Sequence, residues 1–259
     1  MNLGIKGRQA LICASSKGLG RACAESLCRE GVDITICARS PEVLAKTVTD
    51  IRRIGGGSVN SVACDVTTIE GQRALLAVCP EPDIVVNNAG GPPPGDFRDW
   101  GYDAWSAALN ANMLTPIFII KATLDGMIER KFGRIVNITS SAVKAPIDFL
   151  GLSNGARSGL TGFVAGLARQ TACHNVTINS ILPGPFQTDR LDQTLKALAE
   201  KEEKLVGKVR KDKIQTIPAK RFGKPSELGD LCAYLCSAQA GFITGQNIVI
   251  DGGMYPGTF

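Results

Sequence analysis

Short apolar or β-branched runs alternate with helical patterns along the whole chain. The runs predict seven strands, which are Gln9–Ala14, Val32–Ala38, Ser58–Cys64, Asp83–Val86, Arg134–Ile138, Val176–Leu182 and Asn247–Ile250. The first helix is expected over Leu19–Arg29. Strands that alternate with helices are typical of βαβ units and a parallel sheet. We therefore expect an α/β fold with a doubly wound, seven-stranded parallel sheet, helices on both faces, and ligands at the carboxyl ends of the strands.

Length and composition fit this architecture. The chain has 259 residues, of which 44% are apolar and 20% charged, so it is long enough to bury a full core. No linker or change of composition divides it, and we expect a single domain over residues 1–259. Residues 1–7 carry no long apolar run, and the apolar stretches elsewhere are read as strand-sized. These features predict a soluble, cytoplasmic protein without a membrane span.

The nine cysteines are odd in number and stand in apolar strand or helix segments, which predicts reduced thiols in the core. Cys232 and Cys236 lie four residues apart, but the chain has no CxxC pair and only one histidine, His174. No metal site is expected.

The net charge of +5 is concentrated near the C-terminus. Between Lys196 and Lys224 there are ten Lys or Arg residues and four Asp or Glu residues. We expect a helical flap over about residues 187–220. Its charge fits either a solvated helix face or a surface that attracts an anionic substrate. Repeated aromatic residues that could stack bases are missing from it, so nucleic acid binding is not expected.

A glycine-rich turn follows the first predicted strand. Glycines at a strand-to-helix turn allow the backbone to approach a pyrophosphate, and the helix N-terminus attracts the anion. The turn therefore predicts a dinucleotide site, whose residues are Ala14, Ser16, Lys17, Gly18, Leu19 and Gly20.

With these residues the chain resembles the short-chain dehydrogenase/reductase superfamily, and within it the 3-oxoacyl-acyl-carrier-protein reductases. The family pattern TGxxxGxG keeps Gly18 and Gly20 here but has Cys13 and Ala14 in place of its Thr and first Gly. Alanine at position 14 fits if its φ is negative, because a positive φ favours glycine. The resemblance implies a Rossmann-type fold and further cofactor contacts at Asp65, Val66, Asn88, Ala89, Gly90, Pro183, Gly184 and Thr188.

The end of the second predicted strand favours one nicotinamide nucleotide. A carboxylate there would accept the ribose hydroxyls of NAD, but this chain has Ala38 followed by Arg39. Arg39 and Lys17 are cations that can bind a 2′-phosphate, which predicts NADP, used as NADPH. The alternative is that Arg39 is only an exposed strand-end cation.

The resemblance also implies a catalytic set of Asn, Ser, Tyr and Lys. Asn112 and Ser140 match the first two positions. Thirteen residues after Ser140, Ser153 stands in place of the tyrosine, and Arg157 stands in place of the lysine. A spacing of four residues places both on one helix face. The positions are kept, but their chemistry is changed.

This change removes the usual proton donor. An alkyl alcohol is a far weaker acid than a phenol, and an arginine cannot shuttle a proton near neutral pH. Arg157 is still able to hold the nicotinamide ribose or stabilise an oxyanion. Other candidate donors are Ser140, Ser141, Lys144, Asp148 or a water held by Asn112. His174 stands at the far end of the same helix, so a Ser-His-Asp triad is not expected.

Three functions remain open from the sequence. The first is NADP(H)-dependent carbonyl reduction or alcohol oxidation with an altered proton donor. The second is a non-redox lyase, isomerase or hydrolase on the same fold, and the third is a catalytically inactive dinucleotide-binding protein. The substrate is expected to be a small molecule or acyl thioester, with an anionic group as one option. The segment Ser158–Arg169 has small and apolar residues on more than one face, which predicts a homotetramer or homodimer.

Overall fold

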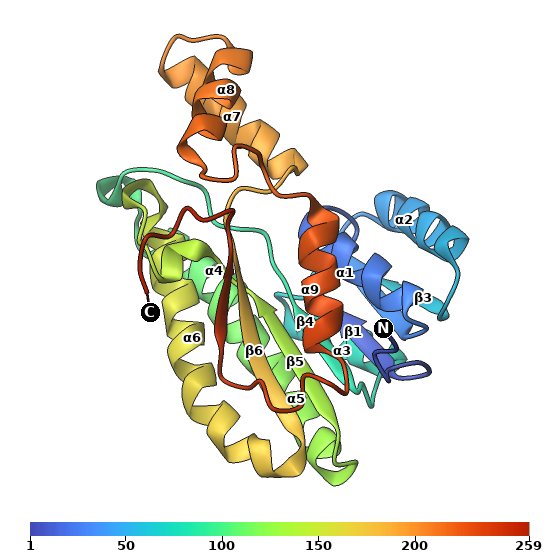
Figure 1. Cartoon of the computed structure of the whole chain (residues 1–259). Coiled ribbons are helices and arrows are strands. Elements are labelled where there is room, and N and C mark those ends of the chain that lie inside the picture. The colour runs from blue at the N-terminus through green and yellow to red at the C-terminus, as the bar shows by residue number, and fades with distance from the viewer. Residues whose placement is uncertain (259) are drawn as a thin grey trace.

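The computed structural model describes residues 1–258. Seven parallel strands form one sheet in the order β3-β2-β1-β4-β5-β6-β7 (Figure 1). Their bounds are β1 (Gln9–Ile12), β2 (Asp33–Ala38), β3 (Val59–Ala63), β4 (Ile84–Asn87), β5 (Gly133–Ile138), β6 (Val176–Pro183) and β7 (Asn247–Ile250). The doubly wound, seven-stranded fold is confirmed, and all seven predicted strands form. The chain changes direction of winding between β1 and β4, where such folds place their ligands.

Nine α-helices and five short helical turns connect the described strands or follow them. The helices are α1 (Gly18–Arg29), α2 (Pro41–Ile54), α3 (Ile69–Val78), α4 (Tyr102–Leu109), α5 (Thr115–Glu129), α6 (Gly151–Thr171), α7 (Asp189–Lys201), α8 (Val206–Thr216) and α9 (Pro225–Leu235). The short turns are η1 (Phe97–Asp99), η2 (Asn110–Leu114), η3 (Ser141–Val143), η4 (Asp148–Leu150) and η5 (Ala172–His174). Side-chain oxygens of Ser40, Thr68 and Thr188 cap α2, α3 and α7, which explains where these helices begin.

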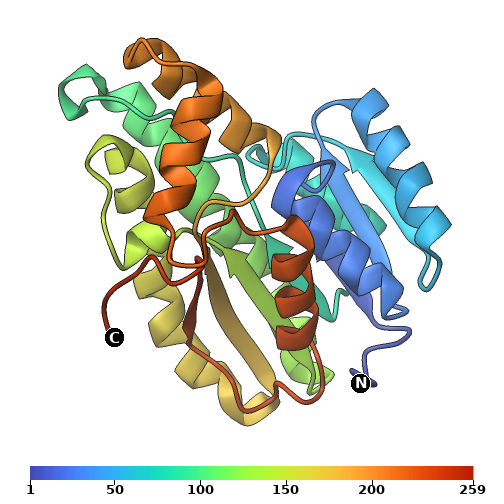
Figure 2. The ribbon, with the colours of Figure 1, turned by 45° about the horizontal axis from the view of Figure 1, so that its top comes forward.

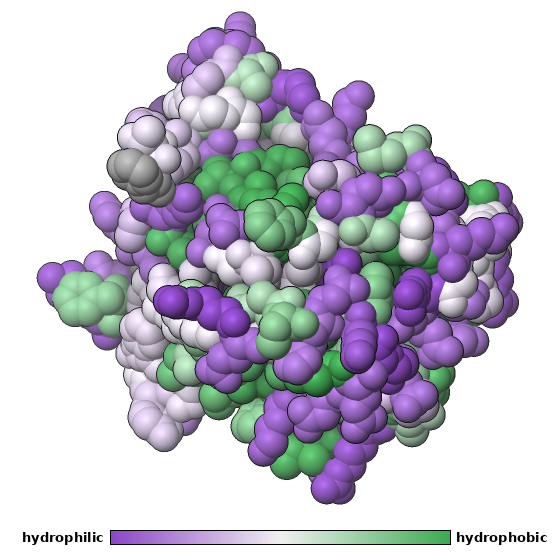
Figure 3. Space-filling view, turned by 60° about the horizontal axis from the view of Figure 1, so that its bottom comes forward, coloured by the Kyte–Doolittle hydropathy of each residue, from purple (hydrophilic) through white to green (hydrophobic). Residues whose placement is uncertain are grey.

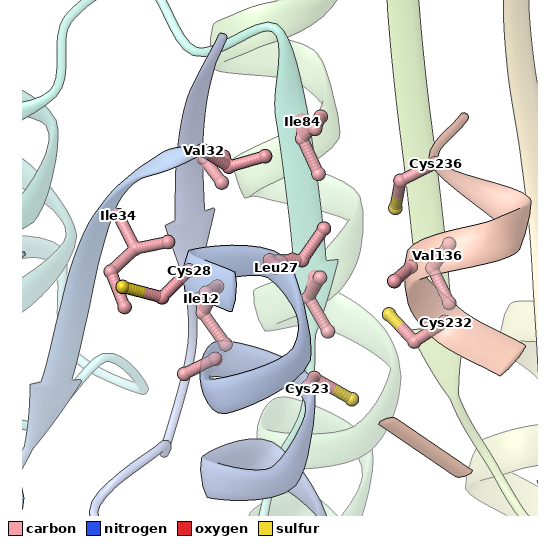
Figure 4. Close-up of a cluster of buried hydrophobic side chains, with 14 of the residues drawn as sticks. Ile12, Cys23, Leu27, Cys28, Val32, Ile34, Ile84, Val136, Cys232 and Cys236 are labelled. Carbon is pink, nitrogen blue, oxygen red and sulfur yellow. The ribbon is translucent and has the colours of Figure 1, made fainter. Parts of the chain in front are cut away.

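Each face of the sheet has its own apolar core. Ala10 and Ile12 of β1 face a cluster with residues of α1, α2 and α9. Leu11 faces a second cluster with residues of α3, α5 and α6. Figure 4 shows part of the first cluster, where α1 and α9 approach each other over the strands. This alternation of side chains fixes the two helical layers.

Helices α1 and α9 pack unusually closely. A Cβ atom added at Gly229 would lie 2.4 Å from the carbonyl oxygen of Ala22 and 2.7 Å from Ser26 Oγ, so no larger residue fits there. Ser26 Oγ donates a hydrogen bond to Asp230 Oδ1 over 2.8 Å. The helix of the glycine-rich turn therefore rests on a helix from the C-terminal part of the chain.

Helices α7 and α8 project from the carboxyl end of the sheet (Figures 1 and 2). They enclose a small apolar cluster made of Leu195, Ala199, Val209, Ile217 and Phe222. Two connecting segments join these helices to the rest of the fold. The segments form an isolated parallel β-bridge between Phe186 and Gly223, where Gln187 N donates to Gly223 O over 2.9 Å.

The cysteines follow the prediction with two exceptions. None of the nine forms a disulfide, and seven are buried, but Cys64 is only partly buried and Cys173 is exposed. Cys173 lies in η5, after α6 has ended, where the chain turns at the surface. The expectation of core thiols is wrong for this residue.

One helical stretch is longer and more apolar than the sequence interpretation allowed. Tyr102–Glu129 is able to cross a membrane by length and composition, with a mean hydropathy of 1.3 over its most apolar window, 39% of which is buried. Its residues Ile119, Ile120 and Met127 pack into the second core cluster against the sheet. The view in Figure 3 shows mostly hydrophilic side chains on the surface, with hydrophobic ones in separate patches. We interpret the stretch as a core helix with one uncovered side.

Candidate active site

The glycine-rich turn corrects one expectation. Ala14 has a φ of +45°, in the left-handed region that favours glycine. On one side of it, Cys13 N donates to Val86 O of β4, and on the other Ser15 N donates to Cys37 O of β2. The chain has to turn between these two bonds, and the turn imposes the positive φ. The condition under which alanine fits this turn, a negative φ, is therefore not met, and the alanine is strained.

Close packing holds this turn in place. Asn88 Nδ2, directly after β4, donates to the Ala14 carbonyl oxygen over 3.0 Å. A Cβ atom at Gly20 would lie 2.6 Å from Asn88 Nδ2, and Gly18 has a φ of +60°. Both glycines are thus required by the local backbone. Asn88 acts here as a positioning residue for the turn.

The N-terminus of α1 fits an anionic group. Lys17 is the N-cap residue, and its side chain makes no capping hydrogen bond. Ser16 and Leu19 are partly buried beside it, and Lys17 is exposed. The first backbone N–H groups of α1 are therefore free of side-chain caps, as a pyrophosphate would require. The donors present fit a dinucleotide.

Arg39 and Asp65 lie near each other after β2 and β3. Arg39 is exposed and makes no ion pair among residues 1–258, so it is free to bind an anion. Burial alone would raise the pKa of Asp65, but hydrogen bonds from the Thr67 amide and hydroxyl, together with the nearby Arg39 charge, lower it. Asp65 is thus a fixed carboxylate, and Val66 beside it is buried.

The loop after β6 approaches the glycine-rich turn. A Cβ atom at Gly18 would lie 3.8 Å from Thr188 Cγ2, which caps α7. Gly184, after Pro183, packs on Asp251 so closely that a Cβ atom would lie 2.6 Å from the Asp251 Cβ. The structure therefore brings these predicted cofactor residues to one edge of the sheet. Ala89 and Gly90, after β4, are partly and fully exposed at the same edge.

Ser140 and Asn112 lie on different elements. Ser140 follows β5, and its Oγ accepts a hydrogen bond from Ala142 N over 3.1 Å. Asn112 lies in η2, a π-helical turn between α4 and α5, and is 3% exposed. Its Nδ2 donates to Ala108 O, but its buried Oδ1 has no partner in the described chain. A π-turn with an unpaired buried acceptor is typical of functional sites.

Ser153 and Arg157 share the buried face of α6, as their spacing predicts. Each is 8% exposed. Arg157 Nη1 donates to the carbonyl oxygen of Ile138 over 2.7 Å, which ties the guanidinium to the end of β5, two residues before Ser140. Burial, and then the charge of Arg190, lower the pKa of Arg157 to about 10. The guanidinium is still charged at neutral pH.

Arg190, at the start of α7, was missed by the sequence interpretation. Its Nη2 donates to Pro92 O over 2.9 Å, and it lies against Gly91 in the loop after β4. The loop and flap sequences match no pattern that we could use to find it. Only the fold shows that its charge acts on Arg157.

The other candidate proton donors are placed less favourably. Lys144 Nζ lies 5.6 Å from the ring centroid of Tyr255, in the C-terminal segment. Ser141 is partly buried, Asp148 is exposed, and His174 is exposed in η5 at the opposite end of α6. A helix of this length separates His174 from Ser153 by roughly 30 Å. A triad that uses His174 is excluded by this distance.

Comparisons with known proteins agree with this geometry. Residues 13–255 match the family described as enoyl-(acyl carrier protein) reductase. The 3-oxoacyl-[acyl-carrier-protein] reductase FabG of Vibrio harveyi is 33% identical over 260 residues, covering 98% of this chain and 99% of the relative. The structure of L-sorbose reductase from Gluconobacter frateurii with NADPH and L-sorbose superposes with a TM-score of 0.93 at 28% identity, covering 98% of each chain. YwfH, an NADPH-dependent reductase involved in bacilysin biosynthesis, gives 0.91 at 27% identity, covering 97% of this chain and all of that one.

Proposed function

The chain belongs to the short-chain dehydrogenase/reductase superfamily, and from this premise we propose that it is an NADPH-dependent carbonyl reductase whose proton donor is not a tyrosine. The observation that carries the proposal is the hydrogen bond from Arg157 to Ile138 O. This bond holds a buried cation at the end of β5, next to Ser140, on the same sheet edge as the glycine-rich turn. A dinucleotide bound along that edge would bring its nicotinamide end to this pair.

The preference for NADPH rests on the cations around the adenosine end. Lys17 and Arg39 are both exposed, and Arg39 has no ion-pair partner among residues 1–258. They would bind the 2′-phosphate, while the α1 N-terminus and Thr188 would hold the phosphates further along. Two relatives in solved structures are described as complexed with, or dependent on, NADPH.

Bound NADPH supplies the hydride, and the residues of this chain position and polarise the carbonyl. Ser140 Oγ is placed to donate a hydrogen bond to the carbonyl oxygen. Arg157 has four further N–H donors beyond the one bound to Ile138, enough to hold ribose hydroxyls and to stabilise the developing oxyanion. Ser153 is too short to reach the position of a phenol oxygen.

The proton is assigned to water. Asn112 Oδ1 is buried and unpaired, which makes it an acceptor suited to an ordered water molecule. Such a water would be fixed by η2 and would pass its proton toward the oxyanion beside Ser140. This route predicts slower chemistry than a phenol gives, because water is not tuned by a neighbouring charge.

We further propose that α7 and α8 act as the substrate flap of one domain formed by residues 1–259, and that the chain forms a homodimer or homotetramer. The uncovered side of neighbouring helices α5 and α6 supports the assembly. Phe118 is 49% exposed there and Phe163 is 39% exposed. Aromatic side chains with this exposure on adjacent helices are typical of subunit contacts.

The first experiment is a fluorescence titration with NADPH and, in parallel, with NADH. We expect micromolar binding of NADPH, and at least about tenfold weaker binding of NADH, since one charge-assisted contact to phosphate is worth this much. Arg39→Gln should reduce the preference, whereas Arg73→Gln, an exposed arginine of α3, should not. Failure to bind either nucleotide would contradict the proposal.

A second experiment tests the proton route. The double variant Ser153→Tyr/Arg157→Lys introduces a phenol and a partner lysine, and should raise the rate of NADPH oxidation with a ketone by about 100-fold, the low end of the range of general acid catalysis. Tryptophan fluorescence and nucleotide binding would show that the variant is folded. Turnover of wild-type protein without any change in nucleotide absorbance would favour the non-redox alternative.

A further inference from the structure

A buried positive charge at the candidate active site has no negative partner. Arg157 is 8% exposed, and its guanidinium makes one hydrogen bond, to the neutral carbonyl oxygen of Ile138. No carboxylate among residues 1–258 forms an ion pair with it. By contrast Arg134, a buried arginine of β5, donates to Ser237 O, Gly133 O and two oxygens of Asn175. Arg134 thus donates to four protein oxygens, whereas Arg157 donates to one.

A second arginine, Arg190 of the flap, lies beside the loop that follows β4, the strand next to β5 in the sheet, and it is exposed. Arg190 Nη2 is held by Pro92 O, in the loop after β4, and Arg190 forms no ion pair among residues 1–258. The two arginines repel each other, and this repulsion adds to the effect of burial on Arg157. Arg157 is buried while Arg190 is exposed, so the unpaired charge is costly at Arg157, and an anion bound between the two would offset that cost.

The proposed cofactor does not supply that anion. Ribose hydroxyls at the nicotinamide end accept hydrogen bonds from Arg157 but are neutral. The 2′-phosphate is assigned to Lys17 and Arg39, and the other phosphates to the α1 N-terminus and Thr188. The positive charges of Arg157 and Arg190 are therefore not neutralised by the cofactor and are available to bind an anionic group of the substrate.

We propose that the substrate is an oxo acid, a carbonyl compound with a free carboxylate, and that Arg157 and Arg190 bind the carboxylate while Ser140 binds the carbonyl oxygen. This inference rests on the proposed function and names the substrate class for it. The planar fork of an arginine matches the two oxygens of a carboxylate, which a lysine does not. The replacement of lysine by arginine at position 157 is thereby explained as a change of specificity.

Arg190 then determines specificity from the flap. It stands at the first turn of α7, two residues after Thr188 caps the helix. From this position its guanidinium would contact the carboxylate. A neutral ketone would lack this contact and would leave both cations unpaired.

The test uses malonate as a dicarboxylate probe and malonamide as its neutral counterpart, without nucleotide. The two tryptophans of the chain report on this site, because Trp100 packs on Gly151 and Trp105 on Gly155, both on α6. Malonate should change tryptophan fluorescence, and malonamide should not at the same concentrations. Arg190→Gln should weaken malonate binding at least about tenfold, the loss expected for one charge-assisted pair.

Lys208→Gln is the matched control, since it removes one positive charge from α8 at an exposed residue without an ion pair. It should leave malonate binding within about twofold of wild type, whereas equal weakening by both variants would show a long-range field and overturn the proposal. Equal binding of malonate and malonamide would overturn it too. In turnover, wild-type protein should prefer 3-oxobutanoate to its methyl ester at least about tenfold in kcat/KM, and Arg190→Gln should reduce this ratio.

Malonate binding requires no NADPH, so the two proposals fail separately. If the protein binds NADPH and reduces neutral ketones without preferring the acid, the reductase proposal is supported and the oxo acid proposal is contradicted. If the protein binds malonate but neither nucleotide, the anion-binding site is supported and the reductase proposal is contradicted.

Discussion

Ala14 introduces backbone strain into the glycine-rich turn. Its φ of +45° is imposed by backbone bonds to β2 and β4, and its carbonyl oxygen is held by Asn88. An L-residue in this region costs about 1–2 kcal/mol relative to glycine. The chain tolerates that cost at the place where its relatives' pattern has glycine. The proposed nucleotide site thus includes a strained residue.

We predict that Ala14→Gly stabilises the protein. Release of the strain is partly offset by the greater freedom of glycine in the unfolded chain, which costs about 0.4–1 kcal/mol. The free energy of unfolding should therefore rise by about 0.5–1 kcal/mol, measured by urea denaturation. Ala22→Gly in α1, where the backbone is helical and buried, is the control and should lower it by about 1 kcal/mol. A loss of stability in Ala14→Gly would show that the strain is absent.

We also predict a separate role for Asn112. Asn112→Leu removes the buried, unpaired Oδ1 and keeps a side chain of similar size. Catalytic turnover should fall by about 100-fold, at the low end of general acid catalysis, while nucleotide affinity changes by less than about twofold. An unchanged kcat would exclude the water route through Asn112.

At the scale of elements, the strands were predictable and the flap contacts were not. Buried parallel strands form apolar runs, so their ends are found within two residues. The buried face shared by Ser153 and Arg157 also follows from helical spacing alone. Arg190 is different, because its role depends on where α7 stands over the loop after β4. No local pattern encodes that contact, and the same holds for the φ of Ala14.

Helix α9 gives a prediction for acid pH. Hydrogen bonds from Arg221 and the Lys224 amide lower the pKa of Glu227 to about 2. This carboxylate therefore contributes stability above its unfolded pKa of about 4.3, and the contribution is lost as pH falls toward 2. Glu227 is only partly buried, so solvent screens its ion pair and the contribution is about 0.5–1 kcal/mol.

Glu227→Gln should show a smaller loss of unfolding free energy between pH 6 and pH 3 than wild-type protein, by about 0.5 kcal/mol. Glu42→Gln is the control, since Glu42 also stands in the first turn of a helix but has no ion pair among residues 1–258. Its acid profile should follow that of wild type. Identical profiles for Glu227→Gln and wild type would contradict the prediction.

At the scale of the whole molecule, the side of α5 and α6 that faces away from the sheet is only partly covered. This explains why Tyr102–Glu129 resembles a membrane span in hydropathy while only 39% of its window is buried. Leu114, Phe118 and Phe163 are all exposed by more than a third. A second copy of the chain would cover these side chains at a gain of about 1.5–3 kcal/mol for each one fully buried.

We therefore predict that Phe118→Glu dissociates the assembly. A buried unpaired carboxylate and a lost aromatic contact should raise the dissociation constant at least about 100-fold, because about 3 kcal/mol is lost. Light scattering after size exclusion would show the smaller mass. Val78→Glu, on the exposed side of α3, should leave the mass unchanged. A monomeric wild-type protein would contradict the proposed assembly.

The tight contact of α1 with α9 also governs the order of events on the ribosome. Gly229 lies on Ala22, and about three quarters of the chain is synthesised between α1 and α9. At 5–20 residues per second, the apolar side of α1 that carries Cys23 and Leu27 (Figure 4) waits for roughly 10–40 s before α9 emerges to cover it. During that interval this apolar side of α1, next to the glycine-rich turn, is exposed on the nascent chain. Exposed apolar surface of this kind is what chaperones bind. The candidate site at this edge is thus completed only when translation is nearly over.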